Sequence, residues 1–207
     1  MIPAPATDET TVSSAPSAWH ALTTRRSVPP TLLAAPGPSR PELVEILSAA
    51  SRVPDHGMIV PWRFVVVEAR RAETLCDRLC AAHAASEDDQ ESSVAAAMTS
   101  KLRSWLIGPP VVVFLVSCPD PTATIIEREQ VLAAAAAATT LLHAATARGF
   151  GSIWLTGWPA YAPEAHAVLG LASGESVIGL FPIGTPLKRP AERPRPIIDR
   201  IVTDWIG

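Results

Sequence analysis

The feature that most constrains the fold is a continuous apolar run near the middle of the chain. Val111–Ser117 reads VVVFLVS and directly follows the chain-breaking sequence Gly-Pro-Pro. A strand without polar alternation is typical of a sheet that is buried on both faces. The chain is therefore expected to build a central sheet with other elements covering both of its sides.

Two further segments predict strands, and several predict helices. Trp62–Glu68 is rich in aromatic and β-branched residues, and residues 176–182 form a similar run. Apolar residues recur at helical spacing between Ser39 and Pro54, and the alanine-rich residues 125–148 predict the longest helix. Shorter helices are expected at residues 18–24, 72–84, 94–105 and 163–169. This order of helices and strands indicates a mixed α+β domain with a central sheet.

The two ends of the chain differ from the middle. Residues 1–18 are rich in proline, alanine, serine and threonine and have no apolar period, so we expect a disordered tail. Residues 19–207 form the single predicted domain. Within it, residues 187–207 are first rich in proline and arginine and then apolar, which predicts that this segment docks on another surface.

Composition argues against several classes of function. The net charge is −3 and the pI is near 5.9, so no broad basic field would attract nucleic acid or an anionic membrane. Three cysteines do not make a disulfide framework. The N-terminus lacks a signal-peptide pattern, and residues 131–147 are too rich in alanine to predict a spanning helix. We therefore expect a cytoplasmic protein.

The first segment that could carry chemistry is Arg25-Arg26-Ser27. Two guanidinium groups and a hydroxyl beside a proline-stiffened stretch could hold a phosphate. A solvated basic turn is the competing explanation, and for an isolated pair of arginines it is the more common one.

Two loop segments offer groups for a flat ligand. In RVPDHG, between a helix end and a strand start, Arg52 and His56 could donate to the carbonyls of a heterocycle. The ordinary alternative for His56 is a hydrogen bond to Asp55. In GFGSIWLTG the glycines would allow a close approach, and Trp154 and Thr156 could line a planar cofactor. A helix end followed by a strand explains that segment equally well.

Other motifs are weaker. Cys76, Cys80 and His83 share one helix face, which could suggest zinc, but closed zinc sites normally need a fourth ligand and no matching pair is found. A packed amphipathic helix explains them better. The chain has no nucleophile elbow, P-loop or dinucleotide-binding glycine motif.

The order of the three segments is more specific than any one of them. RRS lies near the start, and RVPDHG (residues 52–57) and PWRF (residues 61–64) follow the first long helix. GFGSIWLTG (residues 149–157) follows the alanine-rich helix, and a Gly-Thr-Pro turn (residues 184–186) comes near the end. Together they resemble the nitroreductase family, especially its compact single-domain branch, over about residues 19–200. The resemblance implies an α+β sandwich with a mainly antiparallel central sheet flanked by helices. It also implies a homodimer that binds FMN noncovalently at its interface.

The resemblance gives each segment a role toward FMN. RRS would contact the phosphate and ribityl chain, and RVPDHG would make further flavin contacts. The segment Trp154-Leu155-Thr156 (WLT) would line the flavin from the partner subunit. A basic residue near the C-terminus would assist the phosphate. No side chain is expected to act as a nucleophile or metal ligand, although Arg52 could stabilise the reduced flavin. The implied contacts are Arg25, Arg26, Ser27, Arg52, His56, Trp154, Leu155, Thr156, Lys188 and Arg195.

The implied activity is that of an FMN-dependent NAD(P)H oxidoreductase. NAD(P)H would reduce the flavin, which would pass electrons by ping-pong kinetics to a small-molecule acceptor such as a nitroaromatic, a quinone or an activated alkene. Val60 and Leu155 stand where relatives commonly carry polar or basic residues. These departures motivate an alternative, a protein that holds FMN with little or no turnover. A further alternative is an interaction domain without a cofactor that docks through its apolar C-terminal segment.

Overall fold

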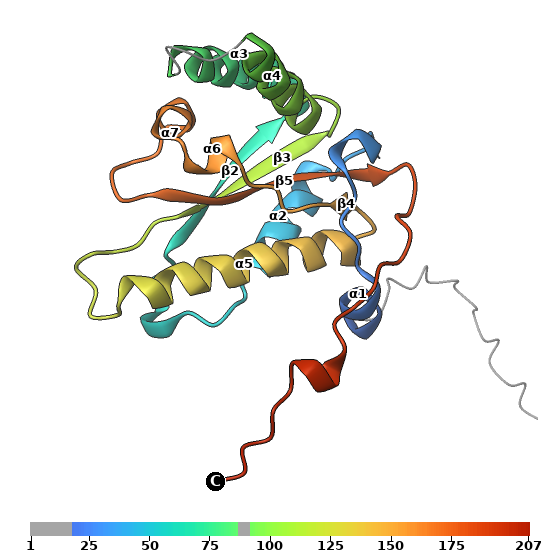
Figure 1. Ribbon diagram of the computed structural model, residues 1–207, viewed down its shortest axis with the longest axis vertical. Helices are drawn as coiled ribbons and strands as arrows, with labels where there is room; N and C mark the ends of the chain where they lie inside the picture. The colour runs from blue at the N-terminus through green and yellow to red at the C-terminus, as the bar shows by residue number, and fades with distance from the viewer. Residues whose placement is uncertain (1–17, 87–91) are drawn as a thin grey trace, which may run out of the picture.

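The computed structural model describes residues 18–86 and 92–207 (Figure 1). Nearly all of the tail predicted at residues 1–18 lies outside these ranges. The strands are β1 (Leu33–Ala34), β2 (Trp62–Glu68), β3 (Val111–Ser117), β4 (Gly151–Ser152) and β5 (Ser176–Pro186). They form one sheet of order β1-β5-β3-β2, and β4 also pairs with β5. Every pairing is antiparallel, which confirms the predicted α+β class with an antiparallel sheet.

Helices cover both faces of this sheet. They are α1 (Ala18–Thr24), α2 (Arg40–Ala50), α3 (Ala69–Ala85), α4 (Ser92–Leu106), α5 (Glu127–Ala147), α6 (Trp158–Tyr161) and α7 (Pro163–Leu169). Figure 1 shows α5 and α2 on one side of the sheet and α3 and α4 on the other. Short 3₁₀ turns add η1 (Pro30–Leu32), η2 (His56–Met58) and η3 (Ile198–Arg200).

Strand β3 is the centre of the core, as its sequence predicts. All seven of its residues are buried. Val113 and Leu115 pack with α2 and α5, whereas Val112 and Phe114 pack with α3, α4, α6 and α7. The alternation of side chains along the strand therefore divides the core into two layers.

Helix α5 is the long alanine-rich helix of the sequence. Its buried alanines let it lie close to the sheet and to α2, and buried Gln130 anchors its start. The Gln130 side chain accepts from the Asp120 N–H and donates to the carbonyls of Asp120 and Ile125. Among the described helices, α5 alone is long and apolar enough to span a membrane, and 44% of that apolar window is buried inside the protein.

Local differences from the predictions lie where the pairing is long-range. The proline-rich stretch after α1, for which the sequence predicts no helix or strand, contains the turn η1 and the short strand β1. Strand β5 continues past Pro182 to Pro186, because its last residues pair with β1 and β4. Helix α2 starts as expected, with a reciprocal cap between Ser39 and Glu42, and ends at Ala50.

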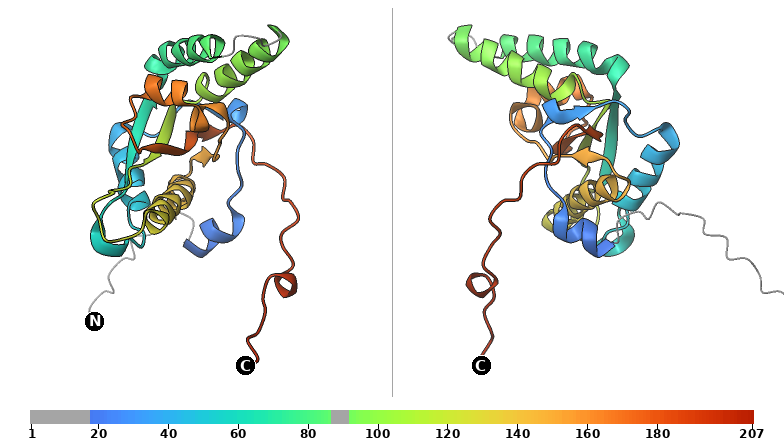
Figure 2. Two further views of the ribbon diagram at one scale, coloured as in Figure 1. Left: turned by 60° about the vertical axis from the view of Figure 1, so that its left-hand side comes forward. Right: turned by 90° about the vertical axis from the view of Figure 1, so that its right-hand side faces the viewer.

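The C-terminal segment leaves the domain after β5. Both views in Figure 2 show it extending away from the body. Its apolar side chains are exposed, with Ile198 at 63% and Trp205 at 91% of their accessible area. The described part of the same chain therefore does not cover the apolar end of this segment, residues 197–206, which the sequence predicts to dock on another surface.

Candidate functional site

Arginines from the two ends of the domain meet beside α1. Arg25, Arg26 and Ser27 line a cavity of about 70 Å³ together with Arg193 and Arg195. Arg26 fixes the C-terminal segment there by donating to the carbonyl oxygen of Ala191. The cavity thus combines the predicted RRS segment with one of its two predicted C-terminal partners, Arg195.

The electrostatics of this arginine cavity favour an anion. Burial, and then repulsion from Arg195, Arg193 and Arg26, lowers the pKa of Arg25. Its Nη1 atom is buried and has no hydrogen-bond partner among the described residues. A buried cationic donor without an acceptor is costly, so phosphate oxygens placed here would satisfy it.

One carboxylate already stands among these arginines. Glu192 Oε1 lies 3.4 Å from Arg26 Nη1 and 2.8 Å from Arg195 Nη2. The same oxygen accepts from the Arg193 N–H at 3.0 Å, the main cause of the lowered pKa of Glu192. Glu192 therefore neutralises part of the positive charge at the cavity.

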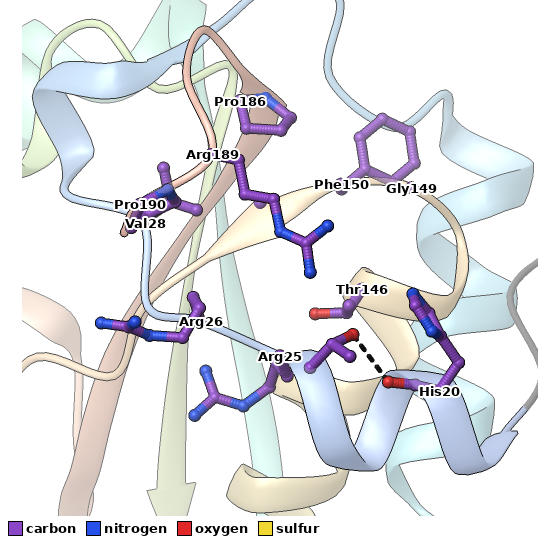
Figure 3. A pocket seen from close by; sticks show the side chains of 12 residues that line it. His20, Arg25, Arg26, Val28, Thr146, Gly149, Phe150, Pro186, Arg189 and Pro190 are labelled. Atoms are coloured by element: carbon purple, nitrogen blue, oxygen red, sulfur yellow. Dashed lines mark hydrogen bonds between the residues drawn. The ribbon is translucent and has the colours of Figure 1, made fainter. Parts of the chain in front are cut away.

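A second cavity, of about 240 Å³, adjoins the first and shares Arg25 and Arg26 with it. In Figure 3, Arg189 of the C-terminal segment points toward Thr146 near the end of α5. Phe150 adds an aromatic wall. Lys188, the other predicted C-terminal partner, is exposed and does not line either of these two cavities.

The WLT segment starts near the arginine cavity and follows β5. The Val28 N–H donates to Ser152 at 3.1 Å, and Leu155 exchanges backbone hydrogen bonds with Leu180 at 3.0 and 2.9 Å. The Leu155 side chain packs on the core layer of α3 and α4. Thr156 is exposed.

The indole of Trp154 has a structural role. Its Nε1 donates to the carbonyl of Ile178 at 3.0 Å, and its ring lies 5.5 Å from that of Phe181. Because the ring packs on the α2 and α5 layer, Trp154 offers a ligand its backbone more than its indole.

Arg52 and His56 do not line the arginine cavity. Arg52 is exposed in the turn after α2. His56 Nδ1 lies 2.7 Å from Glu129 Oε2 in the first turn of α5. Asp55, the ordinary partner considered for His56, instead accepts from the Val60 N–H at 2.7 Å. The positive φ of Val60, 53°, is rare for a β-branched residue, so this loop is locally strained.

The predicted site residues therefore form two groups within one chain. His56 is bonded to Glu129 at the start of α5, whereas Arg25 lies near Thr146 at its end. At 1.5 Å per residue these two positions on α5 are separated by about 25 Å. The structure thus brings RRS, Arg195 and WLT to one side, and keeps Arg52 and His56 apart from them.

Sequence reasoning missed Arg193. The segment has no periodic apolar pattern, and only the fold returns it to Arg25. A signal was nevertheless present, because Arg193 and Arg195 are two residues apart in an extended stretch and so point to the same side.

Other polar clusters have structural roles. Cys76 and His83 are buried, and the His83 ring meets Trp158 edge-on at 4.9 Å. Within residues 18–86 and 92–207, no three His, Cys, Asp or Glu side chains gather as a metal site would require. Burial and Glu175 raise the pKa of Cys118 to about 12, so this thiol stays protonated near neutral pH.

Comparison with known proteins identifies similar sequences and similar folds. The model of the nitroreductase family matches residues 22–185. A Haemophilus influenzae protein named "Putative NAD(P)H nitroreductase" is 34% identical over 179 residues, covering 86% of this chain and 92% of that protein.

Solved structures share the fold. A nitroreductase-like family protein from Bacillus cereus has a TM-score of 0.81 at 22% identity, over 95% of this chain and 100% of the other. A point mutant of the FMN and NADPH-dependent nitroreductase NfnB from Sphigopyxis sp. strain HMH has a TM-score of 0.71 at 22% identity, over 92% and 99% of the two chains. With the family model matching from α1 to the end of β5, the chain belongs to the nitroreductase family.

Proposed function

We propose that this protein binds FMN and uses it as an NAD(P)H-dependent oxidoreductase for small-molecule acceptors. Family membership supports the enzyme class. The observation that carries the cofactor is the arginine cavity, where Arg25 presents a buried donor without a partner among the described residues. The FMN and NADPH dependence of NfnB, a structural neighbour, supports the same cofactor pair.

The residues present fit FMN at its phosphate end. Arg25, Arg26, Arg193 and Arg195 would hold the phosphate, and Ser27 would add a hydroxyl donor. The backbone from Ser152 to Thr156 would then follow the flavin along β5. When bound, FMN would take electrons from a reduced nicotinamide and deliver them to a nitroaromatic, a quinone or an activated alkene.

The separation of the two groups supports a site shared between two chains. A single FMN that starts at Arg25 does not reach His56 of the same chain across about 25 Å of helix. We therefore propose that RRS, Arg193, Arg195 and WLT come from one subunit, and that Arg52 and His56 come from its partner. The resemblance had implied that WLT comes from the partner, and the proximity of WLT to RRS favours this different assignment.

The cofactor is tested by the visible absorption of the purified protein after incubation with FMN and desalting. A retained flavin band is expected for the wild type. Arg25→Ala should weaken FMN binding by about 1.5–3 kcal/mol, the loss expected for a buried charge-assisted contact. Lys188→Ala is the matched control, because it removes an exposed cation of the same segment. A colourless wild type would favour the interaction domain instead.

Turnover is tested separately by adding NADH or NADPH to the flavin-loaded protein without oxygen. Rapid bleaching of the flavin band is expected. A band that survives both nucleotides would support the alternative of a flavin-holding protein.

A cytoplasmic location, and the lack of nucleic-acid and membrane partners, stay predictions from composition.

A further inference from the structure

Helix α4 lies directly against the loop that follows WLT. Gly157 has a φ of 124°, and a Cβ added there would lie 3.2 Å from Cη2 of Trp105 and 4.0 Å from Nζ of Lys101. An aromatic ring and an ammonium group from α4 therefore cover this loop.

The ammonium group is held in place by the aromatic ring. Lys101 Nζ lies 4.8 Å from the centre of the Trp105 ring, within the range of a cation–π contact. Trp105 is itself half-buried and packs with the core layer of α3 and α4. Among the described residues, no carboxylate forms an ion pair with Lys101. The ring thus positions the charge of Lys101, and no carboxylate of residues 18–86 or 92–207 neutralises it.

A second cation on the same helix faces elsewhere. Arg103 pairs with Asp77 of α3, with 3.6 Å between Nη1 and Oδ1. Side chains two positions apart in the sequence are rotated by about 200° around the helix axis, so Arg103 and Lys101 point to different sides of α4. Lys101 alone of these two turns toward the loop.

Lys101 lies far from the proposed FMN phosphate position, at the end of the site where the electron acceptor would bind. From Ser152, near the arginine cavity, to Gly157 the chain advances five residues, about 16 Å in an extended strand. Lys101 stands at the far end of this proposed flavin wall, where an acceptor would approach. A lysine ammonium is a compact cation with three donors, which suits a carboxylate.

We propose that Lys101 is a specificity residue that binds the carboxylate of an aromatic electron acceptor, with Trp105 holding the ammonium group in position. The proposal rests on the proposed FMN-dependent function and names the substrate class of that site. It makes carboxylated acceptors better substrates than neutral ones of the same shape.

The test compares flavin-loaded wild type, Lys101→Gln and Arg103→Gln. Binding of benzoate, which is not reduced, is followed by the shift of the flavin absorption band. Turnover is measured with 4-nitrobenzoate and with neutral nitrobenzene. In Lys101→Gln we expect the Kd for benzoate and the KM for 4-nitrobenzoate to rise about tenfold, as for one lost charge-assisted hydrogen bond. The KM for nitrobenzene should not change, and Arg103→Gln should match the wild type throughout.

Several outcomes would overturn the proposal. Equal effects of Lys101→Gln on both acceptors would show a structural role for this residue. An increase in the KM for NADH or NADPH alone would assign the lysine to the dinucleotide. A flavin-loaded protein that does not discriminate between the acceptors refutes only this inference, whereas a protein that retains no flavin refutes the proposed function as well.

Discussion

Single residues determine how strongly the arginine cavity attracts an anion. Arg26 and Arg195 both contact the Glu192 carboxylate, which would compete with the phosphate of FMN for the same donors. Glu192→Gln should therefore tighten FMN binding about two- to fivefold, the range of a partly exposed ion pair. Fluorescence titration of FMN would measure this effect.

The control for this change is Glu45→Gln. Glu45 pairs with Arg148 outside the arginine cavity, so its loss should leave the Kd for FMN unchanged. Weaker FMN binding in Glu192→Gln would contradict the prediction and show that the carboxylate orients Arg195 for the phosphate.

A second prediction concerns the ion pair that joins β2 to the start of β5. Arg63 donates to both carboxylate oxygens of Glu175, at 2.7 and 2.6 Å, and the Glu175 side chain is 14% exposed. These hydrogen bonds are the main reason that the pKa of Glu175 falls from 4.5 to about 2. A carboxylate with a lowered folded-state pKa stabilises the fold above 4.5 and loses this effect as the pH falls toward 2.

Glu175→Gln should therefore lower the free energy of unfolding by about 1–3 kcal/mol near neutral pH. The difference from wild type should shrink as the pH drops below about 4.5, as urea titrations at several pH values would show. Glu68→Gln breaks an exposed pair with Arg70 and should change little. A difference from wild type that is constant with pH would refute the assignment to this ion pair.

At the scale of elements, the sequence was most informative where local pattern and burial agree. β3 and α7 have the predicted bounds, because a continuous apolar run and a Pro-to-Gly segment are local signals. β1 and the end of β5 escaped prediction, because two-residue pairings depend on partners more than 100 residues away.

For the site, RRS and Arg195 could be predicted to meet, but the structural role of Trp154 could not. Its hydrogen bond to Ile178 depends on how the loop folds onto β5.

The contact between this loop and β5 leads to a third prediction. A methyl group added at Gly179 would lie 2.2 Å from Nε1 and 2.5 Å from Cδ1 of Trp154. Gly179→Ala should destabilise the protein by about 1–3 kcal/mol through overpacking. In a Trp154→Leu background, where the smaller side chain leaves room, the same change should cost less. Thermal unfolding of the four proteins measures this coupling, and equal costs in both backgrounds would place the clash elsewhere, at the Leu155 carbonyl.

At the scale of the whole molecule, α5 acts as a spacer. Its last turn lines the second cavity, which adjoins the arginine cavity, and its first turn carries Glu129, which pairs with His56. Exposed apolar side chains on the C-terminal segment and on α1, among them Trp205 and Trp19, leave a large surface uncovered in one chain. Such a surface favours association with a second copy. Light scattering at micromolar concentration should therefore report the mass of a dimer.

A shared site makes a sharper prediction than dimer mass. Arg25→Ala and His56→Ala should each weaken FMN binding when prepared alone, because every site in either homodimer lacks one residue. A mixed dimer has one site that lacks both residues and one intact site, with Arg25 from one chain and His56 from the other. Random exchange of equal amounts should thus restore tight binding at about a quarter of all sites. Titration with FMN after unfolding and refolding the mixture would count them.

The matched control is a mixture of Arg25→Ala with Arg26→Ala. These residues line the same cavity in one chain, so every site in the mixed dimer still lacks one arginine and no tight sites should return. Recovery in the first mixture but not in the second requires that the arginines and His56 reach one flavin from different chains. Recovery in neither would mean that a single chain builds the whole site. In that case His56, at the other end of α5, would not contact the flavin that the arginine cavity binds.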